Sequence, residues 1–195
     1  MAVIATEFKL GARASCSDGH CGEVTRTILD PDFRTITHLI IEHKYEIGSG
    51  RLVPIDLVGT TGDEITLRCT LAEFDQLDPA EEVELAEGLD YGNFGSMGIG
   101  MGVGHPMPTI VSDNVPAGGA EVARHDHVHA LDGEIGKVKG FAVDAGHKVT
   151  HVLLQEGHLW GRKEVAIPVS AVTAVDGGIR LNLTRQQVED LPPLG

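Results

Sequence analysis

Short apolar segments separated by turn residues make up most of the chain, and this alternation predicts a mainly β fold. Asp18-Gly19 predicts a hairpin turn, because both residues tolerate the positive φ that such a turn requires. Pro54 predicts an edge or bulge position, since proline has no N–H to donate within a sheet. The strands predicted for the first third of the chain are residues 22–29, 35–42, 52–58 and 64–69.

Two short helices are predicted from capping boxes, in which side chain and backbone satisfy each other's free donors. Thr70-Leu71-Ala72-Glu73 and Thr184-Arg185-Gln186-Gln187 have this pattern. The acidic segment 80–87 is predicted to extend the first helix or to form a short helix of its own. The apolar residues expected on the buried faces of the two capped helices are Phe74, Leu77, Val188 and Leu191.

The same elements occur twice, at a shift of 114 residues. Asp18-Gly19 matches Asp132-Gly133 at this shift. Further matched pairs are Gly22 and Gly136, Val24 and Val138, Asp30 and Asp144, Pro54 and Pro168, Ile65 and Ile179, and Leu67 and Leu181. The period is far too long for a solenoid, so each copy is predicted to be a small domain. The expected organisation is a first domain over 1–79, an acidic and then Gly/Met-rich linker over 80–120, and a second domain over 121–195.

Size and charge narrow the possible functions. A copy of about 70 residues buries only about 60% of its unfolded surface, so we expect the copies to pack on each other or on a second chain. No stretch approaches the ~20 apolar residues of a membrane span, and the N-terminus lacks a signal-peptide pattern. We therefore expect a soluble, cytoplasmic protein without a membrane span. The net charge of −14, without a Lys/Arg cluster in the sequence, disfavours direct binding of nucleic acid.

The three cysteines, Cys16, Cys21 and Cys69, all lie in the first copy. Their odd number predicts free thiols in a reducing compartment rather than a disulfide framework. Cys16, His20 and Cys21 are a possible redox or metal cluster, but their spacing is not the C-x-x-C that lowers a thiol pKa. The second copy has Ala130, Glu134 and Ile135 at these positions. We therefore expect packing cysteines, with metal binding as the alternative.

Two sets of histidines are considered as functional sites. Alternation of His125, His127 and His129 would place three imidazoles on one face of a strand, and imidazole suits zinc, copper or nickel. The alternative is a solvent-facing strand, which we favour because no fourth ligand stands at a recognisable spacing. His38 and His151 are the only histidines that recur between the copies, and each ring is expected to pack at a domain rim and donate to a backbone carbonyl.

The linker and one loop carry the residues expected to meet a partner. Gly98-x-Gly100-x-Gly102-x-Gly104 lacks the following helix start that a phosphate-binding loop needs. Nearby methionines could hold Cu(I), but methionine more often serves an adaptable docking surface. Exposed loop aromatics are enriched at interfaces, and the alternative for Trp160 is that its ring covers the end of its own domain. The residues considered for partner contact are Met97, Met101, Leu159 and Trp160.

The ordered motifs resemble PRC-barrel domains, the small β-barrels named from the photosynthetic reaction centre H subunit and found also in ribosome maturation factors. The motifs are Asp-Gly-x-x-Gly-x-Val, a Val-Thr-His-Leu-type strand, a Val/Ile-Pro-Val/Ile strand and a closing Thr-x-x-x-(Phe/Val)-x-x-Leu helix. The resemblance covers 8–79 and 121–193, and 157–165 is similar to the longer loop of tandem members. It implies two small barrels, each closed by a short C-terminal helix, and a role in binding and assembly without shared catalytic residues. The chain lacks the additional N-terminal domain of the maturation factors and a membrane anchor, so neither of those functions is expected.

The sequence thus predicts a non-catalytic cytoplasmic adaptor that binds a protein partner or itself. No catalytic residue, cofactor or metal site is predicted, because no Ser/His/Asp or paired-carboxylate spacing exceeds chance. The alternative function is a metal- or small-ligand-binding sensor that uses the histidine and cysteine clusters. What recurs in the two copies specifies the fold, so a local function is expected among the residues that do not recur.

Overall fold

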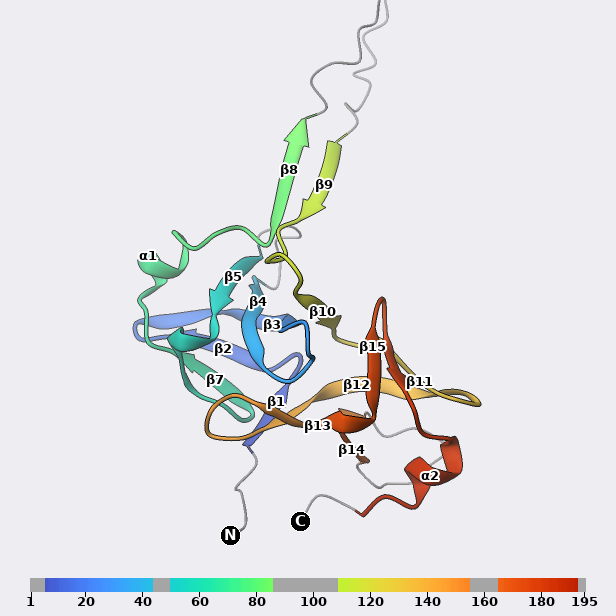
Figure 1. Cartoon of the computed structure of the whole chain (residues 1–195). Coiled ribbons are helices and arrows are strands. Elements are labelled where there is room, and N and C mark those ends of the chain that lie inside the picture. The colour runs from blue at the N-terminus through green and yellow to red at the C-terminus, as the bar shows by residue number, and fades with distance from the viewer. Residues whose placement is uncertain (1–5, 44–49, 86–108, 155–164, 193–195) are drawn as a thin grey trace, which may run out of the picture.

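The computed structural model describes residues 6–43, 50–85, 109–154 and 165–192, and this part of the chain is mainly β (Figure 1). Its strands form two curled sheets of matching strand order and a separate hairpin. The first unit contains β2 (Arg13–Cys16), β3 (Gly19–Leu29), β4 (Ile36–Glu42), β5 (Arg51–Pro54), β6 (Val58–Thr60), β7 (Glu64–Leu67) and helix α1 (Leu71–Phe74). The second contains β11 (His127–Ala130), β12 (Gly133–Val143), β13 (Val149–Leu154), β14 (Ala166–Pro168), β15 (Val172–Val175), β16 (Ile179–Leu181) and helix α2 (Arg185–Glu189).

The strand prediction for the first unit fails at one place. The expected strand 52–58 is interrupted by a 3-10 turn, Ile55–Leu57, that directly follows Pro54. The turn carries the chain from β5, which pairs with β4, to β6, which pairs with β7. The second unit has the same interruption at Val169–Ala171. β5 is the terminal strand of its sheet, so the edge position predicted from Pro54 is confirmed.

The first strand of each unit belongs to the sheet of the other unit. β1 (Thr6–Lys9) pairs antiparallel with β12, with Thr6 opposite Val143. β10 (Ala120–Ala123) pairs antiparallel with β3, with Ala120 opposite Leu29. Both members of the second pair differ from those of the first by 114 residues, so the two pairings are one contact made twice. The units have therefore exchanged strands reciprocally within a single chain.

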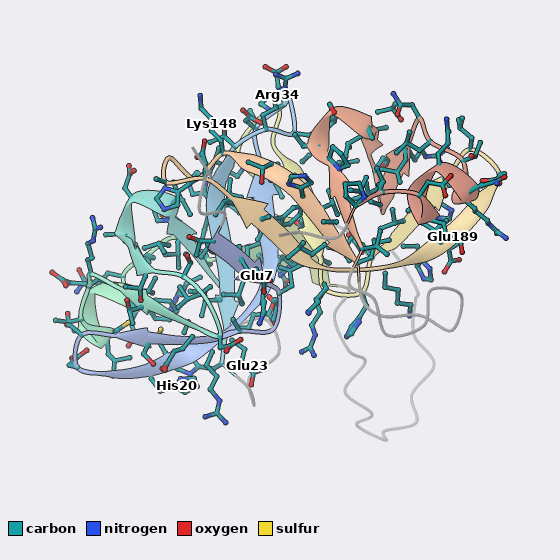
Figure 2. All side chains as sticks on the ribbon, turned by 90° about the horizontal axis from the view of Figure 1, so that it is seen from below. Glu7, His20, Glu23, Arg34, Lys148 and Glu189 are labelled. Atoms are coloured by element: carbon teal, nitrogen blue, oxygen red, sulfur yellow. The ribbon has the colours of Figure 1, made fainter. Side chains whose placement is uncertain are left out.

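A second symmetric contact joins the turns that precede β4 and β13. The Ile36 amide donates to the His147 carbonyl at 3.2 Å, and the Val149 amide donates to the Arg34 carbonyl at 2.7 Å. Arg34 and Lys148 accordingly lie beside each other at one end of the boundary between the units (Figure 2). The two units thus make equivalent contacts with each other, as subunits of a two-fold homodimer do.

The core is continuous across the two units. Phe8 on β1 lies opposite Phe141 on β12, and both side chains are fully buried in a cluster that includes residues of both sheets. Val122, the counterpart of Phe8 on β10, is buried in the same cluster. Of the two expected arrangements, packing of the copies on each other or on a second chain, the structure has the first. Each small unit obtains part of its buried surface from the other.

Each capped helix is also tied to the Asp-Gly hairpin of its own unit. Both capping boxes are present as predicted, at Thr70 and Thr184. In addition, Asp18 Oδ1 accepts from the Leu71 amide at 2.7 Å, and Asp132 Oδ1 accepts from the Arg185 amide at 2.8 Å. The recurring aspartate therefore satisfies a helix N-terminal donor as well as forming a turn. That second role explains why aspartate occurs at this position in both copies.

Substitution of Phe8 tests whether the exchanged strand stabilises both units. We expect Phe8→Ala to lower the free energy of unfolding by about 3–5 kcal/mol, because it removes a fully buried aromatic ring. Urea denaturation, monitored by hydrogen exchange of the β4 and β13 amides, should show one unfolding transition common to both units. Leu131→Ala, at a side chain 68% exposed, is the control and should change stability by less than about 0.5 kcal/mol. Loss of only one unit's protection in Phe8→Ala would contradict the shared core.

Candidate functional site

An arginine with three carboxylates lies where the exchanged strand β10 meets the first unit. Arg26 on β3 is 3.0 Å from Glu42, 2.8 Å from Glu81 and 3.3 Å from Glu121, and only 13% of its side chain is exposed. Burial lowers the pKa of Arg26, but the hydrogen bonds and charges of the glutamates outweigh it and raise this pKa overall. Glu42 ends β4 and Glu121 belongs to β10, so the cluster joins both units.

Among the described residues of the second unit there is no such cluster. Its counterpart of Arg26 is Gly140, where an added Cβ would overlap the carbonyl oxygen of Phe8 on β1. The close approach of β1 leaves no space for a side chain there. Arg26 is thus one of the residues that differ between the copies, and it has a specific task in the first unit.

That task is to hold the base of a hairpin formed by β8 (Glu81–Leu85) and β9 (Thr109–Asp113). Glu81 is opposite Asp113 at the base, and the Asn114 amide donates to the Ala80 carbonyl at 2.8 Å just below it. The hairpin projects away from the two curled sheets (Figure 1). Within the described residues, neither of its edges pairs with another strand.

The helix predicted for 80–87 is therefore wrong, because β8 occupies this segment. The overlooked signal is strict alternation in Glu82-Val83-Glu84-Leu85, which has the period of two residues typical of a strand. The partner strand, Thr109–Asp113, lies beyond the glycine-rich segment, so local sequence gave no reason to pair the two. Part of the expected linker 80–120 thus has regular structure.

The three cysteines gather in the core of the first unit. Cys16, Cys21 and Cys69 are buried free thiols, and the Sγ atoms of Cys16 and Cys69 are 4.0 Å apart. Burial raises the pKa of Cys16 to about 12 and that of Cys69 to about 11, and burial also raises the pKa of Cys21. His20 is exposed and points outward from the first unit (Figure 2). The alternative cluster of Cys16, His20 and Cys21 is therefore wrong for His20, which points away from the thiols, whereas Cys69 contacts Cys16.

The histidine alternation does not form one face of a strand. His125 lies in a turn with φ of 74°, before β11 begins at His127. His127 and His129 do share the exposed face, with ring centroids 6.3 Å apart, and His127 Nδ1 is 2.6 Å from Glu134 Oε1. The hydrogen bond from His127 lowers the pKa of Glu134. Residue spacing missed Glu134, which the Asp132-Gly133 hairpin places opposite His129.

The recurring histidines make one equivalent contact in each unit. His38 Nδ1 is 3.1 Å from Thr37 Oγ1, and His151 Nδ1 is 3.1 Å from Thr150 Oγ1. Each threonine hydroxyl donates to a carbonyl, of Ile28 in the first unit and of the matched Ala142 in the second. The expected bond to a carbonyl is thus made by the threonine hydroxyl, and the histidine ring is hydrogen-bonded to that hydroxyl. Burial lowers the pKa of His38, which favours a neutral ring.

A cavity of about 550 Å³ lies where the two exchanged strands cross between the units. Leu10 and Gly11 line it from one strand and Arg124 and His125 from the other, and these are matched pairs at the shift of 114. Gly11 has φ of 85° and His125 has φ of 74°, so both crossings turn through a left-handed residue. The histidine is in the less common conformation for a side-chain-bearing residue. We call this cavity the crossover pocket.

Met97, Met101, Leu159 and Trp160 lie outside the described residues. Among the residues that the structure does describe, no group of three His, Cys, Asp or Glu side chains is arranged to hold a metal ion. The described helices are also all too short or too polar to cross a membrane. Comparison with protein-family models and with curated proteins finds no match for this chain.

Thiol reactivity tests the structural role of the cysteines. With a pKa of about 12, roughly one Cys16 in ten thousand is a thiolate at pH 8, and burial also blocks access. We expect Ellman's reagent to modify Cys16, Cys21 and Cys69 of the native protein slowly and together, at the rate of global unfolding. In guanidinium chloride, all three thiols should react within minutes. Rapid modification of one thiol in the native protein would show an accessible, activated cysteine and contradict this account.

Proposed function

We propose that the chain is a non-catalytic assembly module that binds a basic protein partner through the β8–β9 hairpin. The observation that supports this proposal is the hairpin itself, which projects from the two sheets and has no strand paired at either edge in the described residues (Figure 1). Unpaired strand edges present rows of amide and carbonyl groups that another chain can extend.

The energetics of the hairpin favour a partner. A two-stranded hairpin alone is marginally stable in water, and a third strand adds backbone hydrogen bonds. Its base is held to the body by the ion pair of Glu81 with Arg26, so its direction is set before a partner arrives. A partner strand would therefore meet a partly ordered site, which lowers the entropic cost of binding.

Charge indicates the chemistry of the partner. The ten residues of β8 and β9 include Glu81, Glu82, Glu84 and Asp113 and no lysine or arginine. The whole chain has a net charge of −14, so electrostatic repulsion opposes pairing of two copies through this hairpin. A strand carrying Lys or Arg would be attracted instead. This favours a different, basic protein over self-association.

Two further features support an assembly role. The motif resemblance to PRC-barrel domains implies binding and assembly, and we propose that the two curled units are barrels of that type. The exchanged strands make the two units a joined platform from which the hairpin projects. The free, buried cysteines accord with a reducing compartment, so we propose a cytoplasmic location.

Removal of the hairpin tests the proposal. Replacement of residues 82–112 by Asn-Gly would close a two-residue turn on the opposed pair Glu81 and Asp113, leaving the Arg26 cluster intact. We expect this variant to keep the circular dichroism spectrum and melting temperature of the full chain. A partner recovered by affinity capture, then purified, should bind the full chain at least ten-fold more tightly than the variant.

Charge reversals provide the matched control. Glu82→Lys with Glu84→Lys should also abolish binding, whereas Asp176→Lys with Glu189→Lys makes the same charge change at exposed positions away from the hairpin and should not. Equal loss in both double variants would show a general charge effect and contradict the hairpin site. Recovery of no partner, with sedimentation showing a strict monomer, would overturn the assembly function. A dimer that the hairpin replacement dissolves would instead contradict the choice of a basic partner.

A further inference from the structure

The crossover pocket gathers positive charge in a strongly acidic protein. Lys9 from β1, Arg124 from the turn after β10 and Lys139 from β12 line it, together with His125 and a single carboxylate, Asp63. The sequence contains no Lys/Arg cluster, because these three cations come from segments far apart in the chain. The strand exchange brings them together. Three cationic side chains and one carboxylate therefore line a cavity in a protein with a net charge of −14, and Glu7, outside the lining, is 3.4 Å from Lys9.

The fold does not require these cations. At the shift of 114, Lys9 matches Ala123, Arg124 matches Leu10 and Lys139 matches Thr25. Each cation thus has an uncharged residue at its matched position. Because each cation occurs in only one of two equivalent positions, strand crossing alone does not account for any of them.

The local geometry gives Arg124 its place. A Cβ on Gly11 would fall 2.6 Å from Nη1 of Arg124, so the glycine leaves the space that the guanidinium occupies. No carboxylate of the described residues lies within ion-pair distance of Arg124. Lys9 is bound differently, at 2.6 Å from Asp63 and 3.4 Å from Glu7, and these two carboxylates, Asp63 above all, raise the pKa of Lys9 and keep the amine protonated.

His125 adds a second indication. It has a left-handed backbone with φ of 74°, at the position where the other copy has glycine. A residue with a side chain is disfavoured in this conformation, because its Cβ approaches the following carbonyl oxygen. The histidine is thus kept at some cost to stability, and it lines the same cavity as Arg124.

We propose that the crossover pocket binds a small phosphorylated molecule. Guanidinium and ammonium groups are the side chains that recognise phosphate oxygens, and Arg124 supplies a planar pair of donors. The volume of about 550 Å³ falls in the range of small-molecule sites. Asp63, at the same cavity, can accept from a hydroxyl of the organic part. This site is independent of the hairpin.

The acidic surface restricts the ligand to a small one. Charge is screened over about 8 Å at physiological salt, so a small anion in the pocket senses chiefly the nearby cations. A nucleic acid would extend over the acidic surface beyond them, where its phosphates are repelled. A pocket for a small phosphorylated molecule is therefore compatible with the expectation that the chain does not bind nucleic acid directly.

Calorimetric titration with inorganic pyrophosphate tests the site. We expect saturable binding to the full chain, weakened at least ten-fold by Arg124→Gln. Arg13→Gln is the matched control, because Arg13 is an exposed arginine on β2 outside the pocket. No binding at millimolar pyrophosphate, or equal weakening by the two variants, would overturn the proposal.

Amide chemical shifts of the unmodified protein provide a readout that needs no variant. On addition of pyrophosphate, shifts should change at residues 9–12, 124–126 and 138–139. Sodium sulfate at matched ionic strength is the control for general anion attraction and should bind at least ten-fold more weakly. Changes scattered over the surface, or equal responses to sulfate and pyrophosphate, would contradict a phosphate site.

Discussion

The exchange of β1 and β10 is the contact on which the other features of this protein depend. Each strand leaves its own unit and completes the sheet of the other, with the same register in both directions. A unit of about 70 residues is marginal alone, and the exchange adds buried residues such as Phe8 and Val122 to the neighbouring core. The two copies consequently have one hydrophobic core, although the sequence presents them as successive domains.

The exchange also determines where the copies can differ. Positions that recur, such as Asp18 and Asp132, make equivalent bonds in both units. Positions near the crossing do not recur: Gly140 must be small because β1 approaches it, while Arg26 at the matched position holds the hairpin. Each cation of the crossover pocket likewise occurs at only one of its two matched positions. Of two matched residues, one can therefore take a role that the other does not have.

Sequence patterns were sufficient for features set by neighbouring residues. The capping boxes at Thr70 and Thr184 and the edge position of Pro54 each depend on only a few residues, and all are present. The repeat itself indicated two similar β units. These features could be predicted because local backbone chemistry decides them.

Features that depend on distant segments could not be predicted in this way. The pairing of β8 with β9 crosses a long glycine-rich segment, and the strand exchange leaves the local pattern of each strand unchanged. The left-handed turn at His125 results from the crossing, so alternation of histidines wrongly indicated a continuous strand. The contact of Cys16 with Cys69 likewise depends on the parallel pairing of β2 with β7. In each case, tertiary structure determines which residues meet.

Disulfide trapping of β1 tests the exchange most directly. The background would carry Cys16→Ala, Cys21→Ile and Cys69→Leu, the residues found at the matched positions of the second copy. Thr6→Cys with Val143→Cys reports the exchanged strand, and Thr6→Cys with Leu29→Cys reports β1 folded back on its own unit. Opposed residues of antiparallel strands are close enough for a disulfide. We expect an intramolecular disulfide between positions 6 and 143 in the monomer and none between 6 and 29; the reverse result would contradict the account.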